Sequence, residues 1–381
     1  MAPHIDQFRL IDPFTFYPMV DVPTKDRLWG RKKYLEKGLQ ILRVEAYAED
    51  IATLQADTLI IDIELHECIL CAHKLGIPCI VRSPWFTHLE SPVLPPLFTN
   101  IIPGQGWKGS KVGTAFVWLI LKLRIAKEHF ANRLQGRINR RSLLVYFGKR
   151  IGFPTRSLVF SSFPPVFSYN SLLTLSMNLQ QLEFPHKAST RYQYLGPMVL
   201  EEPPNSAAAQ HEAVLTAATQ KEEGRRIIYC TFGTLIEGDQ RLLQALVDAI
   251  AERKTWTLII SSKMAPSRLQ LSDNTFLFSY VPQKTLLSYC DCCIHHAGIN
   301  TVNECIHFSV PMLFYNVGDV DKNGVTARFR YHDLAIIGNL KKDGPEDIAG
   351  HIEVLLGSSW KNKMLALQAK YIHDLGINTL L

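Results

Sequence analysis

The second half of the chain alternates short apolar runs with amphipathic segments, and this pattern restricts the fold more than any other feature of the sequence. The apolar runs are rich in β-branched and aromatic residues and span 226–232, 255–261, 275–280, 292–295 and 311–316. Between them, residues 241–253, 284–289 and 300–308 carry apolar side chains at helical spacing. Short strands that alternate with helices predict a parallel sheet covered by helices on both faces.

The first half is partly similar, so we expect an α/β protein with two domains. Predicted helices span 31–55, 65–75 and 112–141, and predicted strands span 58–62, 79–83, 157–161 and 194–195. We assign 1–200 to a first Rossmann-like domain, 201–225 to a polar linker, 226–360 to a second Rossmann-like domain, and 361–381 to a helix that packs back on the first domain. The crevice between two such domains is the expected ligand site.

Composition excludes several other classes. The chain is 47% hydrophobic and 20% charged, which is incompatible with disorder over most of its length. A net charge of +6 is too small to predict a nucleic-acid partner. The 8 cysteines lie mostly in apolar runs and lack the paired spacing of a zinc site, so we expect free thiols, no metal and a cytoplasmic location.

One strand-to-helix turn carries the residues most typical of phosphate binding. It reads His295-His296-Ala297-Gly298-Ile299-Asn300-Thr301. The turn follows the carboxyl end of a predicted parallel strand, and the free N–H groups of the next helix attract anions. A second turn, Phe232-Gly233-Thr234, is predicted to face the same anion. Taken alone, either turn also fits an ordinary βα connection.

The combination of motifs is more specific. Tyr280-Val281-Pro282-Gln283, then the segment HHAGINTVNE at 295–304, then VPMLFYNVGDVDKNGVTAR at 310–328 stand in this order. Together they resemble the nucleotide-binding signature of the UDP-dependent glycosyltransferases of GT-B fold, which include bacterial macrolide and carotenoid glucosyltransferases, plant secondary-product glycosyltransferases and animal UDP-glucuronosyltransferases. The resemblance implies two Rossmann-like domains facing a cleft, a UDP-sugar as donor substrate, and no cofactor.

The resemblance also implies roles for individual positions. Tyr280 would stack on uracil, Val281 would hold the base edge through its backbone, and Gln283 would contact the ribose or the base. Glu304 would accept the ribose hydroxyls. The diphosphate would contact His296, Gly298, Asn300 and Thr301, with Thr234 on the opposite side. Asp321 and Lys322 would read the sugar hydroxyls, although Lys322 replaces the glutamine usual in the family and offers only donors.

The family reaction implies a general base, which the sequence does not reveal. An acceptor hydroxyl attacks the anomeric carbon while UDP leaves, and a histidine oriented by a carboxylate takes the proton. Asp62, at the end of the run TLIID, fits the orienting carboxylate; a solvated strand-end aspartate is the alternative. No strand–Gly–His–helix pattern precedes residue 58, and His4 stands before a predicted strand instead of after one.

We therefore expect an incomplete first domain that lacks its first βα units. Without a central strand, an inner strand becomes an edge and apolar surface is exposed, which predicts poor solubility or a partner chain. Three functions remain open at this point. They are transfer of a hexose to a hydrophobic small-molecule hydroxyl, UDP-sugar binding by a catalytically impaired remnant, and a membrane-associated subunit completed by another chain.

Residues 108–150 combine basic and apolar side chains. The segment holds eleven lysines and arginines, a single acid at Glu128, and the apolar run 116–121. A basic helix beside an apolar stretch is typical of peripheral contact with an anionic membrane, and such contact would favour a lipophilic acceptor. The alternative is a helix that packs over the sheet and keeps a solvated outer face. No window approaches the 18 apolar residues of a transmembrane helix.

Overall fold

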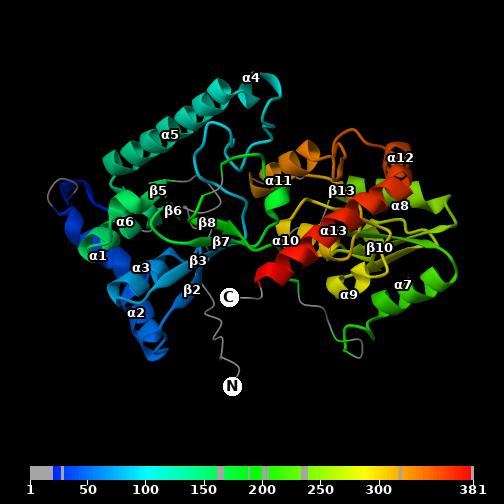
Figure 1. Cartoon of the computed structure of the whole chain (residues 1–381), viewed down its shortest axis with the longest axis horizontal. Helices are drawn as coiled ribbons and strands as arrows, with labels where there is room; N and C mark the ends of the chain where they lie inside the picture. Colours follow the sequence, from blue (N-terminus) through cyan, green and yellow to red (C-terminus); the bar gives the residue numbers. More distant parts are fainter. Residues whose placement is uncertain are drawn as a thin grey trace.

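The computed structural model describes residues 20–26, 30–160, 167–187, 189–199, 203, 206–232, 239–316 and 320–378. Two α/β halves lie side by side, each built on its own parallel sheet (Figure 1). The predicted fold class, α/β with parallel sheets, is therefore confirmed.

The C-terminal half contains a six-stranded sheet in the order β11-β10-β9-β12-β13-β14, and every neighbouring pair is parallel. Its strands are β9 (Arg226–Thr231), β10 (Trp256–Ser261), β11 (Thr275–Phe278), β12 (Cys292–His295), β13 (Met312–Phe314) and β14 (Ile336–Ile337). Alternate residues of β9 enter separate cores, with Ile227 and Tyr229 on one face and Ile228 and Cys230 on the other. Burial on both faces explains why the strands are apolar throughout.

Helices cover both faces of this sheet. They are α7 (Glu212–Glu222), α8 (Gln240–Ala251), α9 (Gln283–Leu287), α10 (Ile299–His307), α11 (Val320–Tyr331), α12 (Pro345–Leu355) and α13 (Ser358–Asn378). Helix α7 falls within the predicted linker, but Ala213, Val214 and Ala217 are buried in the core that Ile227 and Tyr229 join. Residues 212–222 therefore pack as part of the C-terminal half.

The N-terminal half contains a four-stranded parallel sheet in the order β2-β3-β7-β8. Its strands are β2 (Leu59–Asp62), β3 (Cys79–Ser83), β7 (Thr174–Ser176) and β8 (Tyr192–Tyr194). Two separate antiparallel ribbons pair β1 (Val20–Asp21) with β4 (Arg137–Ile138), and β5 (Leu158–Phe160) with β6 (Phe167–Tyr169). The helices are α1 (Arg31–Ile41), α2 (Val44–Thr53), α3 (His66–Lys74), α4 (Gly106–Gly109), α5 (Lys111–Leu134) and α6 (Arg140–Arg150).

Strand β2 lies at the edge of this sheet within the described part of the chain. Ile61 of β2 and Val81 of β3 are buried against α3 and α6, but Ile60 points to the other face and is 68% exposed. An apolar side chain on an edge strand is unusual in a monomeric protein, because such edges pair readily with other chains.

Two predicted helices are each divided in two. The segment 31–55 breaks at Leu42 and Arg43, where Arg43 adopts a left-handed φ of 55°. The segment 112–141 ends as a helix at Leu134, because Gly136 has φ 72° and Asn139 then caps the separate helix α6. Left-handed residues end a helix, and Gly is the residue that adopts that conformation most easily.

The described side chains of α13 pack on their own half. Met364 and Leu367 enter the core beside α10, and the Lys361 ammonium donates to the Ser309 carbonyl at 2.9 Å. The expected packing of this helix on the first domain stays a prediction, since side chains beyond residue 370 lie outside the description.

A buried ion pair joins the two halves. Arg328 of α11 donates from Nε to Glu183 Oε1 at 2.6 Å, and both side chains are 1% exposed. The guanidinium lies between the rings of Phe86 and Phe184, at 4.7 and 4.6 Å. Asn303 of α10 also donates to the Met177 carbonyl at 3.3 Å. These contacts hold α10 beside the N-terminal half.

Candidate nucleotide-sugar site

The turn from β12 to α10 has the geometry of an anion site. Gly298 precedes the first turn of α10, whose leading backbone N–H groups have no partner within the helix. A Cβ atom on Gly298 would lie 2.7 Å from His296 Nε2, so glycine leaves the space that the imidazole occupies. Ala297 reaches the turn through a left-handed φ of 65°.

The two adjacent histidines have different environments. His296 is 8% exposed and stacks on Phe232, with ring centroids 6.4 Å apart and an interplanar angle of 25°. His295 is fully buried, and its ring meets Phe314 edge-on at 4.8 Å. Burial and the neighbouring His296 hold the pKa of His295 well below its usual range, so His295 is a neutral core residue.

His295 also lies close to two thiols. One ligand-type atom from each of Cys293, His295 and Cys305 lies within 4.8 Å of the other two. Burial raises the pKa of both thiols, which keeps them protonated and suited to apolar packing. Three buried ligands are fewer than the four of a structural zinc site, and the expectation of no metal stays a prediction.

Three polar side chains meet on the face of α10 that follows the turn. Gln283 of α9 donates from Nε2 to Thr301 Oγ1 at 3.3 Å and to a carboxylate oxygen of Glu304. The Tyr229 hydroxyl donates to Gln283 Oε1 at 3.1 Å and thereby fixes the orientation of the amide. Burial raises the pKa of Glu304, although the bond from Gln283 opposes this shift.

Tyr280 and Val281 precede α9. Tyr280 is 64% exposed, and its ring meets that of His211 at 5.8 Å and 73°. The exposed ring is free to stack on a planar base. Val281 is 5% exposed, so its side chain is not available to a ligand.

The predicted sugar-reading residues are described only in part. Lys322 is buried on α11, at 7% exposure. Asp321 lies on the same helix, but its side chain is outside the description, and Thr234 lies outside the described residues. Asn300 is exposed at the start of α10.

A cavity of about 310 Å³ connects this turn to the N-terminal half. Ile299 and Asn300 line it from α10, and it is completed by Asp62, Glu64, Leu65, Pro84 and Trp85. Asp62 therefore faces the start of α10 across the boundary between the halves. Its carboxylate accepts from an Arg82 guanidinium nitrogen at 2.8 Å and from the Glu64 N–H at 3.0 Å.

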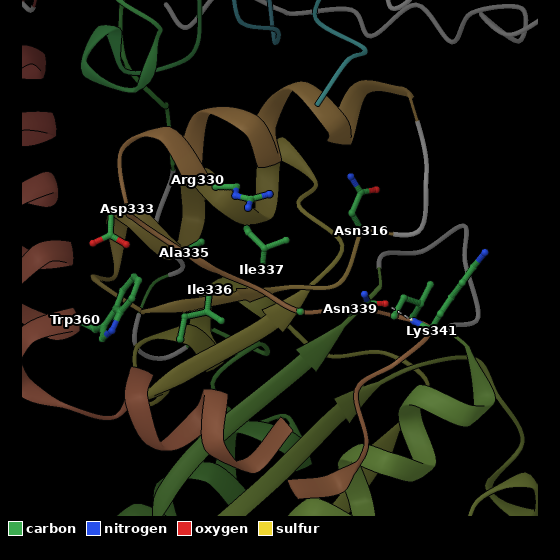
Figure 2. Close-up of a pocket in the computed structure, with 11 residues that line it drawn as sticks. Asn316, Arg330, Asp333, Ala335, Ile336, Ile337, Asn339, Lys341 and Trp360 are labelled. Carbon is green, nitrogen blue, oxygen red and sulfur yellow. Dashed lines mark hydrogen bonds between the residues drawn. The ribbon is translucent and has the colours of Figure 1, made fainter. Parts of the chain in front are cut away.

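A larger cavity, of about 840 Å³, lies along β14 and is lined by Asn316, Arg330 and Trp360 among others (Figure 2). None of the predicted donor residues lines it.

Comparison with known sequences decides the family. The model of the family described as "UDP-glucoronosyl and UDP-glucosyl transferase" matches residues 164–374, more than half of the chain. The chain belongs to this family. The match includes α9, α10 and the turn between β12 and α10, so the cluster of Gln283, Thr301 and Glu304 lies in the part that the family model recognises.

Two curated relatives of this chain match shorter stretches. The uncharacterized UDP-glucosyltransferase YdhE of Bacillus subtilis (strain 168) is 32% identical over 90 residues, 23% of each chain. The zeaxanthin glucosyltransferase of Pantoea ananas is 26% identical over 190 residues, 49% of this chain and 41% of that protein. The chain thus spans less than half the length of either relative.

Solved structures share the fold over most of the chain. The glycotransferase of kitacinnamycin has a TM-score of 0.61 at 14% identity, over 91% of this chain and 78% of that one. UDP-glucose: anthocyanidin 3-O-glucosyltransferase in complex with UDP has a TM-score of 0.56 at 16% identity, over 95% of this chain and 83% of that one. These likenesses confirm the GT-B fold.

Two residues of the site were not predicted. Arg82 forms an ion pair with Asp62, and His211 meets Tyr280 and caps α7 by accepting from the Ala213 N–H at 3.2 Å. In the sequence, Arg82 is simply a polar residue on a predicted strand, and His211 is one residue of a polar segment. Neither position predicts a role in the site. Both contacts arise from tertiary packing, for which local sequence gives no signal.

Proposed function

We propose that this protein transfers a hexose from a UDP-sugar to a hydroxyl of a hydrophobic small molecule, with inversion at the anomeric carbon and without a metal ion. One observation carries the proposal: a cavity between the halves is lined by Asp62 on one side and by Ile299 and Asn300 of α10 on the other. The same helix holds Thr301 and Glu304, which are hydrogen-bonded to Gln283. Family membership supports the same donor class. The zeaxanthin and anthocyanidin glucosyltransferases among its likenesses are consistent with a hydrophobic acceptor.

Different residues would bind different parts of the donor. Glu304 would accept the two ribose hydroxyls, while Gln283 steers the carboxylate through their shared hydrogen bond. Tyr280 would stack on uracil. The first N–H groups of α10, with His296, Asn300 and Thr301, would surround the diphosphate, and Thr234, Asp321 and Lys322 keep their predicted roles toward the phosphate and the sugar.

The proposed step makes one bond and breaks one. The acceptor oxygen attacks the anomeric carbon, the bond from that carbon to the β-phosphate oxygen breaks, and UDP leaves with the electron pair. Charge develops on the leaving diphosphate, where the helix dipole and oriented N–H groups stabilise it without reorganisation. The acceptor proton passes to a base, with Asp62 as the nearby orienting carboxylate; the base itself is not identified.

A second function has a specific observation in its favour. Asp62 is paired with Arg82, and in the described part of the chain β2 lies at the edge of its sheet. This arrangement favours a UDP-sugar-binding protein that is catalytically impaired, or a subunit that requires another chain to complete its N-terminal sheet.

The decisive experiment measures UDP binding by calorimetry and UDP-glucose turnover in the same preparations. Wild-type protein should bind UDP, and Glu304→Ala should weaken binding about 10- to 100-fold because hydrogen bonds to a charged group are lost. Glu222→Ala, which changes an exposed carboxylate on α7, is the matched control and should leave the affinity unchanged. A folded wild-type protein that ignores UDP contradicts the proposal, and binding without turnover favours the second function.

A further inference from the structure

Helix α5 is held to the protein by a narrow part of its surface. It has 24 residues, of which Gly113, Thr114 and Trp118 are buried. Trp118 anchors it by donating from Nε1 to the Leu94 carbonyl at 2.8 Å, and Ser110 caps its first turn. The helix runs along the outer rim of the N-terminal half, away from both sheets (Figure 1).

The outward face of α5 is apolar. We call the following residues, which are 46–73% exposed, the α5 stripe: Val112, Phe116, Leu119, Ile120, Leu123, Phe130 and Leu134. Most of them are three, four or seven residues apart in the sequence, which places them on one side of the helix, opposite Trp118. Trp107 of α4 extends the stripe, since it is 59% exposed and meets Phe116 edge-on at 5.5 Å. A surface helix normally shows the reverse arrangement, with polar residues outward.

Basic side chains border the α5 stripe on both sides. Lys111, Lys122 and Arg133 follow one another at intervals of eleven residues, which is about three turns, so they share one side of the helix. Arg124 and Lys127 lie on the other side. The single acid of the helix, Glu128, is exposed, but its position in the helical repeat places it on the side opposite the α5 stripe. Lys122 is paired with Glu90, and the remaining charge leaves this face positive.

Two further arginines of the basic segment are engaged in ion pairs away from the α5 stripe. Arg140 is buried in an ion pair with Glu67 at 2.5 Å, and Arg150 pairs with Glu36 and Glu45 at 2.8 and 2.7 Å. The candidate surface therefore narrows from 108–150 to α4 and α5. The outer face of this helix is solvent-exposed, as in the alternative interpretation, but many of its residues are apolar.

We propose that the α5 stripe docks this protein on an anionic lipid bilayer, with α5 lying flat in the interface. Its apolar face would enter the boundary between headgroups and acyl chains, and the flanking lysines and arginines would meet anionic headgroups. Trp107 suits the same boundary because its ring is apolar and its N–H is polar. The positive charge favours an anionic bilayer over a second copy of this chain as the binding partner, because two such basic faces would repel each other. In the described chain, no helix has the length and apolar character to cross a bilayer.

Docking would also place the cleft near the membrane. The Trp118 side chain donates a hydrogen bond to the Leu94 carbonyl. Leu94 belongs to the segment that begins with Pro84 and Trp85, and Pro84 and Trp85 line the cavity beside Asp62. This consequence rests on the proposed function: a lipophilic acceptor dissolved in the bilayer would reach the cleft without passing through water.

The test is co-sedimentation of the full chain with phosphatidylcholine vesicles that contain or lack phosphatidylglycerol. We expect binding to the anionic vesicles, weakened by salt, and at least about tenfold weaker partitioning for the double variant Phe116→Ser, Leu123→Ser. A matched control replaces two exposed apolar residues elsewhere, Leu215→Ser and Val354→Ser, and should bind as wild type. A second variant, Arg124→Gln with Lys127→Gln, should lose about tenfold on anionic vesicles and serves if the apolar variant fails to fold.

Three results would overturn the proposal. They are equal sedimentation with and without anionic lipid, unchanged binding by both α5 variants, and lipid-free self-association that the Phe116 and Leu123 substitutions abolish, which would make a second copy the occupant. UDP calorimetry on the same samples separates the two proposals. Vesicle binding without UDP binding would contradict the proposed function and leave the docking surface intact.

Discussion

At the scale of single residues, Gly298 illustrates how one missing side chain shapes the site. Its φ of −65° suits any residue, so backbone conformation does not require glycine here. A Cβ atom at this position would lie 2.7 Å from His296 Nε2, so a larger residue would have to displace the imidazole. The sequence favours glycine at a phosphate turn because it lets the backbone approach the anion closely. The structure adds that it leaves room for the His296 imidazole.

Gly298→Ala should therefore weaken UDP binding about tenfold, because the methyl group displaces His296 at a cost of about 1–3 kcal/mol typical of overpacking. Calorimetry with UDP and a thermal melt measure the two effects. Gly350→Ala is the control, since the structure gives no atom within 4 Å of the added methyl and alanine favours the helix α12. Unchanged UDP affinity in Gly298→Ala would mean that the position of His296 is irrelevant to the diphosphate.

Glu304 gives a prediction on pH. Burial raises its pKa above the ordinary 4.5, so acidification protonates it earlier than a surface glutamate. Protonation replaces a charge-assisted acceptor with a neutral one, and affinity for UDP-glucose should fall roughly tenfold as the pH drops through the raised pKa. Glu304→Gln should bind weakly at every pH in this range. The effect on folding has the opposite sign, because a raised carboxyl pKa stabilises the native state at low pH. A parallel decline in both proteins would assign the titration to another group.

At the scale of elements, the sequence was most informative where strands are buried on both faces. The apolar runs that became β9, β10, β12 and β13 are bounded by polar or Gly-containing segments, and tertiary packing kept them as strands. Helix α5 shows what apolar spacing in the sequence does not determine. Apolar residues at helical spacing predict a helix, but they do not say whether the apolar side faces the core or the outside. The halves of the predicted helix 112–141 separate at Gly136, which the periodicity alone does not mark.

Strand β2 supports a prediction on solubility. Ile60 is 68% exposed on a strand that stands at the edge of its sheet in the described part of the chain. Ile60→Lys should reduce aggregation while changing the free energy of unfolding by less than about 0.5 kcal/mol, because charged edge residues oppose strand pairing. Static light scattering and urea unfolding measure the two quantities. The neighbouring Ile61 is 7% exposed, and Ile61→Lys should prevent folding. If Ile60→Lys proves as damaging as Ile61→Lys, then Ile60 is buried in solution by another segment or chain.

At the scale of the whole molecule, the relative position of the halves depends on a buried polar cluster. Glu183 accepts from Arg328, from the Thr87 N–H and from the Tyr194 hydroxyl, the last two both at 3.0 Å. The aromatic rings on both faces of the guanidinium exclude water from the pair. None of these partners is close in sequence to Arg328, so no local pattern could predict the contact.

Removing one member of the pair should therefore destabilise the protein more than removing both. Arg328→Met leaves Glu183 as an uncompensated buried charge and should lower the free energy of unfolding by about 3–5 kcal/mol. Adding Glu183→Gln should recover part of that loss, which a double-mutant cycle in urea would measure. Arg330→Met changes an exposed arginine on the same helix and should shift stability by less than about 0.5 kcal/mol. Because the pair joins two halves that each have their own core, Arg328→Met should also separate their unfolding transitions. Coincident transitions with no recovery in the double variant would show that apolar contacts, and not this ion pair, hold the halves together.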